Sequence, residues 1–171
     1  MKKIEYLIIQ STETGIGIPV TKADIIDLHT SPVKEGGYGW KRPGFDYLIQ
    51  PDGSLDTLIS ENNTTPVDLW GVSEGTEGIL GTCKHIAYVG GKTEKETKVK
   101  DTRTTAQQAA LDHIVKFYLL KFPNLQILGW DEVPGKEGSG NPGFAVNKWL
   151  DSIGVDPRNI YKALQVQLDN S

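Results

Sequence analysis

Two side chains that bind transition metals lie two positions apart in a stretch with the composition of a β-strand: Cys83 and His85. Alternate residues of a strand face the same side, so the thiol and the imidazole would lie side by side. Both bind zinc, and His29 could supply another nitrogen. A buried thiol and unconnected histidines are the more common outcome, which we favour here. His113 is expected on the surface of a helix.

No serine or carboxylate arrangement makes an independent case for catalysis. Three serines lack the surroundings of a nucleophile elbow: Ser11, Ser73 and Ser139. Asp131 and Glu132 are adjacent, so nothing makes their carboxylates converge on one point. The glycines of 36–39 and 135–140 lack the Gly-Lys-Ser/Thr ending of a phosphate-binding loop, and nucleotide hydrolysis is unsupported.

The composition is that of one globular domain, which we assign to residues 1–171. A net charge of -4 argues against binding to a nucleic acid polymer. The single cysteine excludes an internal disulfide. The apolar run near the start is interrupted by Glu5 and ends at Gln10, which is too short for a signal peptide or a membrane span. We therefore expect a cytoplasmic protein that does not enter the membrane.

The first half of the chain predicts a strand, a helix and a hairpin. Residues 4–9 form a short apolar run that places Gln10 at the end of a buried strand. Thr21 and Asp24 have the spacing of a helix start, with the helix continuing to about His29. The segments 45–50 and 55–59 flank Asp52-Gly53, a turn signal that predicts a β-hairpin. The Gly-rich loop between helix and hairpin carries Tyr38 and Trp40, and such aromatic loops often border a site.

The second half predicts two more strands and two helices. The strands are expected at 84–89 and 125–129, and a loop rich in glycine and proline follows the second one. A long helix should begin after Thr104 or Thr105, end near Phe122, and bury the apolar positions Ala106, Ala110, Ile114, Phe117 and Leu120. A shorter helix at 145–153, with Trp149 inward, and a last turn at 157–164 complete the domain. This order predicts an α/β or α+β domain with a central mixed β-sheet flanked by helices, whose strand ends at Gln10 and Gly129 border a crevice.

Several sequence blocks follow one another in a familiar order. They are Tyr-Leu-Ile-Ile-Gln-Ser-Thr-Glu-Thr (6–14), Gly-Phe-Asp-Tyr-Leu-Ile-Gln-Pro-Asp-Gly-Ser (44–54), His-Ile-Ala-Tyr-Val-Gly-Gly (85–91), Asp-Thr-Arg-Thr-Thr-Ala-Gln (101–107), Ile-Leu-Gly-Trp-Asp-Glu-Val-Pro-Gly-Lys (127–136) and Pro-Gly-Phe-Ala-Val-Asn-Lys-Trp-Leu (142–150). Together they resemble the zinc-dependent N-acetylmuramoyl-L-alanine amidases of the phage-lysozyme and peptidoglycan-recognition-protein type. The resemblance covers residues 4–155 and implies the fold of that family.

The resemblance also implies that the family's chemistry is lost. In that family a histidine ends the first strand, a second histidine follows the Ile-Leu-Gly strand, and a cysteine or acid follows a catalytic lysine. These three zinc-binding positions hold Gln10, Trp130 and Gly138 here. An indole offers only an N–H donor and glycine offers no side chain, so we expect no zinc and no other cofactor. The family's catalytic tyrosine corresponds to Phe45, and only Lys136 matches a catalytic position.

The resemblance further implies an aromatic ligand groove in place of the metal centre. Five aromatic residues belong to segments that the family places around its groove: Tyr38, Trp40, Phe45, Trp70 and Trp130. Together with Gln10 and the cations Lys136 and Arg103, they are the candidate ligand-binding residues. The rings could equally fill the space left by zinc and water. Arg103 has a competing structural role, which we favour, as a partner of Asp101 at the start of the long helix.

These observations predict a pseudoenzyme of the amidase family, without catalytic residues, that binds a muropeptide or another peptidoglycan fragment in the former substrate groove. One alternative is a phage-type protein that sequesters a small anionic, nucleotide-like signalling molecule. A second is an active amidase in which Cys83, His85 or His29 serves as a substitute zinc ligand. A third is a regulator that binds a protein partner through its aromatic loop.

Overall fold

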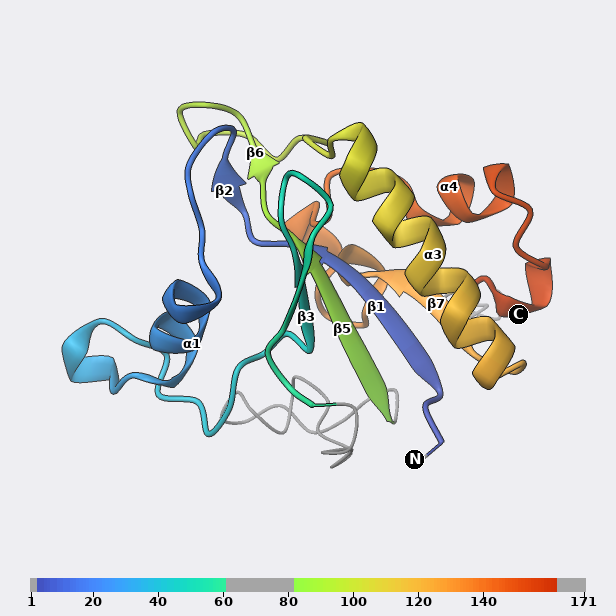
Figure 1. The fold of residues 1–171 in the computed structure, drawn as a ribbon, viewed down its shortest axis with the longest axis horizontal. Helices are drawn as coiled ribbons and strands as arrows, with labels where there is room; N and C mark the ends of the chain where they lie inside the picture. The colour runs from blue at the N-terminus through green and yellow to red at the C-terminus, as the bar shows by residue number, and fades with distance from the viewer. Residues whose placement is uncertain (1–2, 61–81, 163–171) are drawn as a thin grey trace, which may run out of the picture.

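The computed structural model describes residues 3–60 and 82–162, and a five-stranded sheet lies at its centre (Figure 1). Its strands are β1 (Tyr6–Ser11), β3 (Tyr47–Ile49), β4 (Leu55–Thr57), β5 (Cys83–Tyr88) and β7 (Gln126–Gly129). They are arranged in the order β4-β3-β5-β1-β7, and every neighbouring pair is parallel except the β3–β4 hairpin. The expected mixed sheet is therefore confirmed.

Helices and short turns surround this sheet. The α-helices are α1 (Lys22–Thr30), α3 (Thr105–Lys121) and α4 (Val146–Ser152), and the 3-10 turns are η1 (Val33–Glu35), η2 (Trp130–Glu132), η3 (Glu137–Ser139) and η4 (Pro157–Asn159). A second, small sheet joins β2 (Thr14–Gly15) to β6 (Gly91–Lys92). Among the described residues, no helix is long and apolar enough to cross a membrane.

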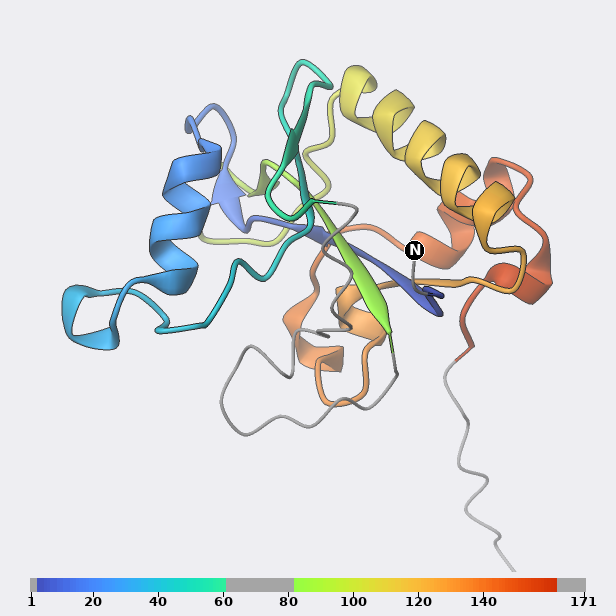
Figure 2. The same ribbon diagram turned by 60° about the horizontal axis from the view of Figure 1, so that its bottom comes forward.

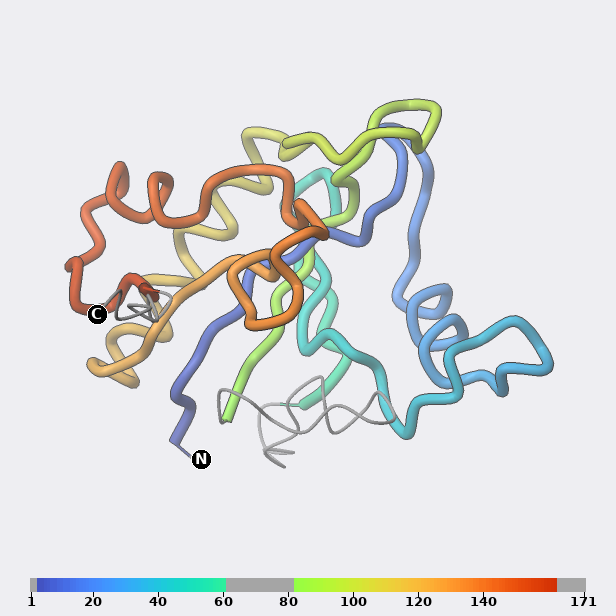
Figure 3. The backbone as a smooth tube through the Cα atoms, turned by 180° about the vertical axis from the view of Figure 1, so that it is seen from behind, coloured from blue at the N-terminus to red at the C-terminus, as the bar shows by residue number. Residues whose placement is uncertain are grey.

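Alternation along the strands assigns side chains to the two faces of the sheet. Leu7 and Ile86 point to the face covered by α3 and α4, where they pack with Leu111 and other buried residues. The opposite face carries α1, whose Ile25 packs against Ala87 of β5. Figure 2 shows α3 and α1 on different sides of the sheet. Seen from behind (Figure 3), the segment that follows β7 crosses the face opposite α3.

The predicted helix starts are confirmed by their capping interactions. The Thr21 hydroxyl accepts a hydrogen bond from the Asp24 N–H, and the Asp24 carboxylate accepts one from the Thr21 N–H. Thr104 and Gln107 form the same reciprocal box at the start of α3. The predicted hairpin is also present, and Gly53 lies in its turn with a φ of 86°, a left-handed conformation that favours glycine.

The predicted buried face of α3 is wrong by about one residue. Phe117 is 47% exposed and Leu120 is 85% exposed, whereas four other positions are buried: Gln107, Leu111, Val115 and Tyr118. The physical reason is the polar Gln107, whose side-chain amide donates to the backbone carbonyls of Ile49 and Val89. These two hydrogen bonds satisfy the amide inside the core, so Gln107 can share the buried face of α3 with Leu111, Val115 and Tyr118.

Smaller differences concern the ends of elements. Strand β1 continues to Ser11, so Gln10 lies inside the strand rather than at its end. Trp149 is half-buried and packs edge-on against Phe144 at a centroid distance of 5.9 Å. The last turn is η4, and the residues after 162 lie outside the described part of the chain, as do Ser73 and Trp70.

Candidate functional site

A pocket of about 160 Å³ opens where β1 ends, between α1, the aromatic loop and η2. Five of the predicted site residues line it: Gln10, Tyr38, Trp40, Phe45 and Trp130. They come from segments far apart in the sequence. The adjacent parallel strands β1 and β7 bring Gln10 and Trp130 together. Backbone hydrogen bonds from Tyr38 to Leu28 and from Trp40 to His29 hold the aromatic loop against the end of α1. The structure therefore places these five residues around one crevice.

A larger hollow of about 420 Å³ lies beside β2, but its polar groups are engaged within the protein. The Gln50 amide donates to the Val20 carbonyl and to the Asp56 carboxylate. The Gln107 amide donates to the backbone carbonyls of Ile49 and Val89, as described above. Because these amides are already satisfied, we take the smaller aromatic pocket as the candidate site.

A buried hydrogen bond between Gln10 and His85 lies at the base of this site. Gln10 Oε1 is 2.9 Å from His85 Nδ1, and both side chains are buried. The carboxamide oxygen can only accept, so Nδ1 carries the proton of a neutral imidazole. Burial, together with the charge of Arg42, lowers the pKa of His85 to about 3. Its Nε2 atom is buried without a hydrogen-bond partner among the described residues.

His29 is a second neutral histidine, and it lines the pocket directly. Its Nδ1 accepts a hydrogen bond of 2.8 Å from the Gly44 N–H, which places the proton on Nε2. Burial lowers the pKa of His29 to about 4. The ring contacts three aromatic rings, with centroid distances of 5.6, 4.8 and 5.0 Å to Tyr38, Trp40 and Phe45. The sequence feature that could have indicated this role is the position of His29 just before the aromatic loop.

Asn141 is a site residue that sequence reasoning missed. Its Oδ1 accepts from the Ser11 N–H at 2.8 Å, and its Nδ2 donates to the Ser11 carbonyl at 3.2 Å. The side-chain amide thus pairs with β1 in the way that a neighbouring strand would. It fixes the loop after β7 to the end of β1 at the pocket's edge. Nothing in the sequence pattern indicated this partner for an asparagine in a glycine-rich loop.

Trp130 and Lys136 lie at the side of the pocket formed by the loop after β7. The Trp130 ring meets the His85 ring edge-on, with centroids 6.3 Å apart. Lys136 Nζ is 5.5 Å from the centroid of the Trp130 ring, although Lys136 does not itself line the pocket. Gly138 lies in η3, where an added Cβ would meet open space.

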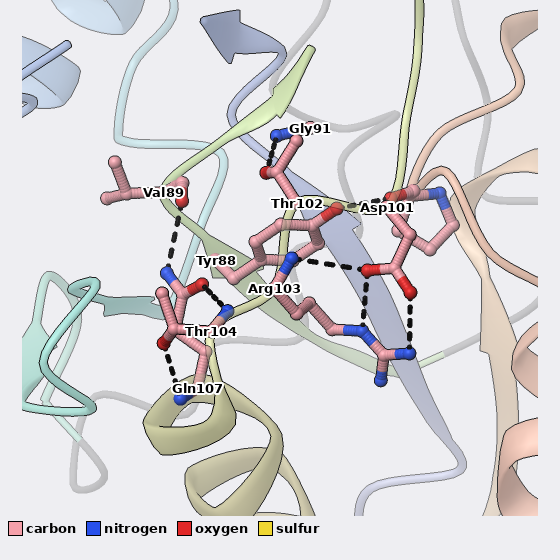
Figure 4. A network of polar contacts seen from close by, with 9 residues as sticks. Tyr88, Val89, Gly91, Asp101, Thr102, Arg103, Thr104 and Gln107 are labelled. Carbon is pink, nitrogen blue, oxygen red and sulfur yellow. Dashed lines mark hydrogen bonds and ion pairs between the residues drawn. The ribbon is translucent and has the colours of Figure 1, made fainter. Parts of the chain in front are cut away.

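Arg103 is not at this pocket, which corrects its place among the predicted ligand-binding residues. Its guanidinium forms two hydrogen bonds with the Asp101 carboxylate, at 3.0 and 3.1 Å (Figure 4). The guanidinium carbon also lies 3.3 Å from the centroid of the Phe144 ring. These contacts hold the cation beside the start of α3, which is the structural role favoured from the sequence. Trp70 lies outside the described residues.

The residues present do not fit a zinc ion. Zinc in proteins is held by about three or four donors from histidine, cysteine or carboxylate side chains. The side-chain oxygen of Gln10, its only atom that could bind a metal, is already bonded to His85. Trp130 has only an N–H, and Gly138 has no side chain. Among residues 3–60 and 82–162, no three His, Cys, Asp or Glu side chains gather at one point. Cys83, the suggested substitute ligand, packs in an apolar cluster with Ile8.

A mixed sheet with α3 and α4 on one face, and with a crevice beside the end of β1, is the fold of N-acetylmuramoyl-L-alanine amidases and peptidoglycan recognition proteins. This fold assignment is confirmed by solved structures. The amidase LysC from Clostridium intestinale is 17% identical over 90% of this chain and 87% of its own, with a TM-score of 0.61. Drosophila PGRP-LB is 17% identical over 91% and 84% of the two chains, also at 0.61.

A third similar structure contains a ligand. Human PGRP-IBETAC, in complex with glycosamyl muramyl pentapeptide, is 17% identical over 95% of this chain and 88% of its own, with a TM-score of 0.60. No protein-family model matches the sequence, and no curated protein matches it. At such low identity the likeness establishes the fold alone.

Proposed function

We propose that this protein binds a peptidoglycan fragment in the aromatic pocket and neither holds zinc nor hydrolyses the fragment. The Gln10–His85 hydrogen bond carries this proposal. The resemblance places a zinc-binding histidine at residue 10, and here that position holds an amide whose oxygen is already bonded. The fold supports the choice of ligand, because a similar structure contains a muramyl pentapeptide.

The pocket has the groups that a sugar–peptide ligand requires. Tyr38, Trp40 and Phe45 provide ring surface for stacking against apolar faces of the ligand. His29 adds a polar group, because its Nε2–H has no hydrogen-bond partner among the described residues and its ring lines the pocket. This N–H can donate to a carbonyl or hydroxyl of the ligand. Stacking surfaces with a few polar groups are typical of binding sites for small ligands.

Amide hydrolysis is not supported by the side chains in the pocket. An attacking water must be activated by a metal ion or a general base, and the developing oxyanion must be stabilised. Phe45 lacks the hydroxyl that the resemblance expects there, and Trp130 and Gln10 cannot take a proton from water at neutral pH. His29 has no free lone pair, because its Nδ1 accepts from the Gly44 N–H and its Nε2 carries the proton. His85 Nε2 has a free lone pair, but burial lowers the pKa of His85 to about 3, which makes it a weak general base.

A small anionic ligand is the weaker candidate. That hypothesis depended on Arg103 and Lys136 as cations, and neither lines the pocket. Arg103 is neutralised by Asp101. An anion would therefore enter a site without a facing cation among the described residues.

The test combines binding with hydrolysis. Titration calorimetry should detect binding of a purified muramoyl peptide, and Tyr38→Ala should weaken it. Phe117→Ala is the matched control, because Phe117 on α3 is similarly exposed, at 47% against 50% for Tyr38. Purified protein incubated with cell walls, with and without added zinc, should release no stem peptides. Absence of binding would overturn the proposed ligand, and released peptides would overturn the claim that the protein does not hydrolyse.

A further inference from the structure

The C-terminal end of α3 exposes apolar side chains that the fold does not bury. Leu120 is 85% exposed, more than any other large apolar residue in the described part of the chain, and Phe117 is 47% exposed. Residues three positions apart on a helix lie on the same side of it, so these two side chains are neighbours. Pro123, just after the helix, is exposed as well. Apolar residues exposed together, rather than singly, are typical of a surface that contacts a partner.

Cations surround this apolar pair. Two hollows of about 370 Å³ each flank the end of α3, and Pro123 lines both of them. The charged residues that line them are four cations and two carboxylates: Lys3, Lys116, Lys121, Arg158, Glu5 and Asp156. Lys121 Nζ lies 4.5 Å from the centroid of the Phe117 ring. We call Phe117, Leu120 and the four cations the α3-end patch, which is positively charged although the whole chain has a net charge of -4.

The two carboxylates are engaged within the protein, whereas the lysines are not. Asp156 pairs with the Arg158 guanidinium at 3.4 Å and accepts from the Arg158 N–H. The Glu5 carboxylate accepts from the backbone N–H of Thr82 at 3.0 Å. Three lysines of the patch form no ion pair with residues 3–60 and 82–162: Lys3, Lys116 and Lys121. Their charges are therefore available to an anionic partner.

We infer that the α3-end patch docks on the surface of an anionic membrane, with Leu120 and Phe117 among the lipid headgroups and the lysines beside the phosphates. Segments that bind a membrane surface combine apolar side chains, which enter the boundary region, with cations that attract anionic lipids. The apolar pair favours lipid over other phosphate-bearing partners. Such docking needs no membrane-spanning helix, and the described residues contain none. A second copy of the chain is disfavoured, because a two-fold interface would bring the same cations together.

The position of the patch leaves the aromatic pocket accessible. One of the two hollows is lined by Tyr6 and Gln126, the first residues of β1 and β7, whereas the aromatic pocket lies where β1 ends. Figure 1 shows α3 running alongside β1 in the opposite direction, so the end of α3 lies near the start of β1. A protein docked through the patch would therefore keep its pocket away from the membrane. The inference does not depend on which ligand the pocket binds.

Co-sedimentation with lipid vesicles tests this inference. The full chain should bind vesicles of phosphatidylcholine mixed with phosphatidylglycerol more strongly than vesicles of phosphatidylcholine alone, and added salt should weaken the binding. Leu120→Asn should lower the partition coefficient about tenfold, because less apolar surface leaves water. Lys116→Gln should lower it about fivefold, because one cation near the anionic surface is lost.

Two variants on η1 are matched controls. Val33 is 74% exposed and Lys34 is exposed, and η1 lies on the other side of the molecule from the end of α3 (Figures 1 and 2). Val33→Asn and Lys34→Gln make the same chemical changes away from the patch, so they should leave vesicle binding unchanged.

The outcomes decide between a membrane surface and other partners. Weaker binding in the two patch variants, with binding retained in the two controls, supports the inference. It is overturned if the protein does not sediment with the mixed vesicles, or if the patch variants bind as well as the controls do. Sedimentation velocity without lipid tests the other occupant. A dimer that Leu120→Asn dissociates would assign the patch to a second copy of the chain and overturn the membrane surface.

Discussion

Lowering the pH from 7 to 5 should destabilise the folded protein through its two buried histidines. Burial lowers the pKa of His85 to about 3 and that of His29 to about 4, so both stay neutral in the folded state across this range. In the unfolded chain each has an ordinary pKa near 6.5 and takes up a proton. The unfolded state therefore binds more protons, and the free energy of unfolding must fall as the pH falls.

The size of the effect follows from this proton uptake. A histidine with an unfolded pKa of about 6.5 that stays neutral in the folded state costs about 1.9 kcal/mol between pH 7 and pH 5. The two residues together should cost about 4 kcal/mol, with most of the loss between pH 6.5 and pH 5. The buried carboxyl of Asp46, whose pKa is raised mainly by burial, acts in the opposite direction. A comparison of single variants is therefore more informative than the total.

Urea denaturation followed by tryptophan fluorescence at pH 7, 6 and 5 measures these free energies. His85→Gln should be less stable at pH 7, because the bond to Gln10 is disturbed, but its loss between pH 7 and 5 should be smaller by about 1.9 kcal/mol. His113→Gln is the control, since His113 is exposed on α3 and should leave the pH dependence unchanged. An unchanged pH dependence in His85→Gln would refute the neutral, buried His85 on which the Gln10 pairing depends.

Four other variants test the core, the edge of the pocket and the position of Arg103 by the same denaturation assay. Leu111→Ala should cost about 2–5 kcal/mol, whereas Leu120→Ala should change stability by less than about 0.5 kcal/mol; equal costs would contradict the assigned face of α3. Asn141→Ala should cost about 1–3 kcal/mol, because it leaves the backbone of Ser11 unpaired, and a neutral result would argue against that clamp. Arg103→Ala should destabilise the protein by about 1–2 kcal/mol without altering muramoyl peptide affinity in calorimetry; a large loss of affinity at unchanged stability would return Arg103 to the binding site.

Local signals in the sequence predict most of the elements. The Thr21–Asp24 and Thr104–Gln107 spacings mark helix starts because capping depends on residues three positions apart. The Asp52-Gly53 turn signal likewise predicts the position of the hairpin. The buried face of α3 was misassigned because Gln107 is polar and so resembles a surface residue in the sequence. Its amide is buried only because it bonds to the backbone carbonyls of Ile49 and Val89, which are distant in the sequence.

The site was predicted unevenly for the same reason. The aromatic residues and Gln10 could be placed because the resemblance supplied their positions. The pairing of Gln10 with His85 could not be predicted from the sequence. It depends on the parallel register of β1 and β5, which places His85 opposite Ile8 and so on the same face of the sheet as Gln10. Asn141 was missed because its partner is a backbone segment, and a backbone segment leaves no signal in residue types.

The clamp between Ser11 and Asn141 also constrains how the pocket can form during folding. The two residues are 130 positions apart, so nearly the whole chain must be in place before this edge can close. Such distant contacts carry a large entropy of loop closure, whereas α1 and the β3–β4 hairpin are built from local contacts that do not need them. A fragment that ends before residue 141 would have the aromatic loop but no complete pocket. Ligand binding would accordingly favour only the fully folded chain and strengthen the connection between β1 and the loop after β7.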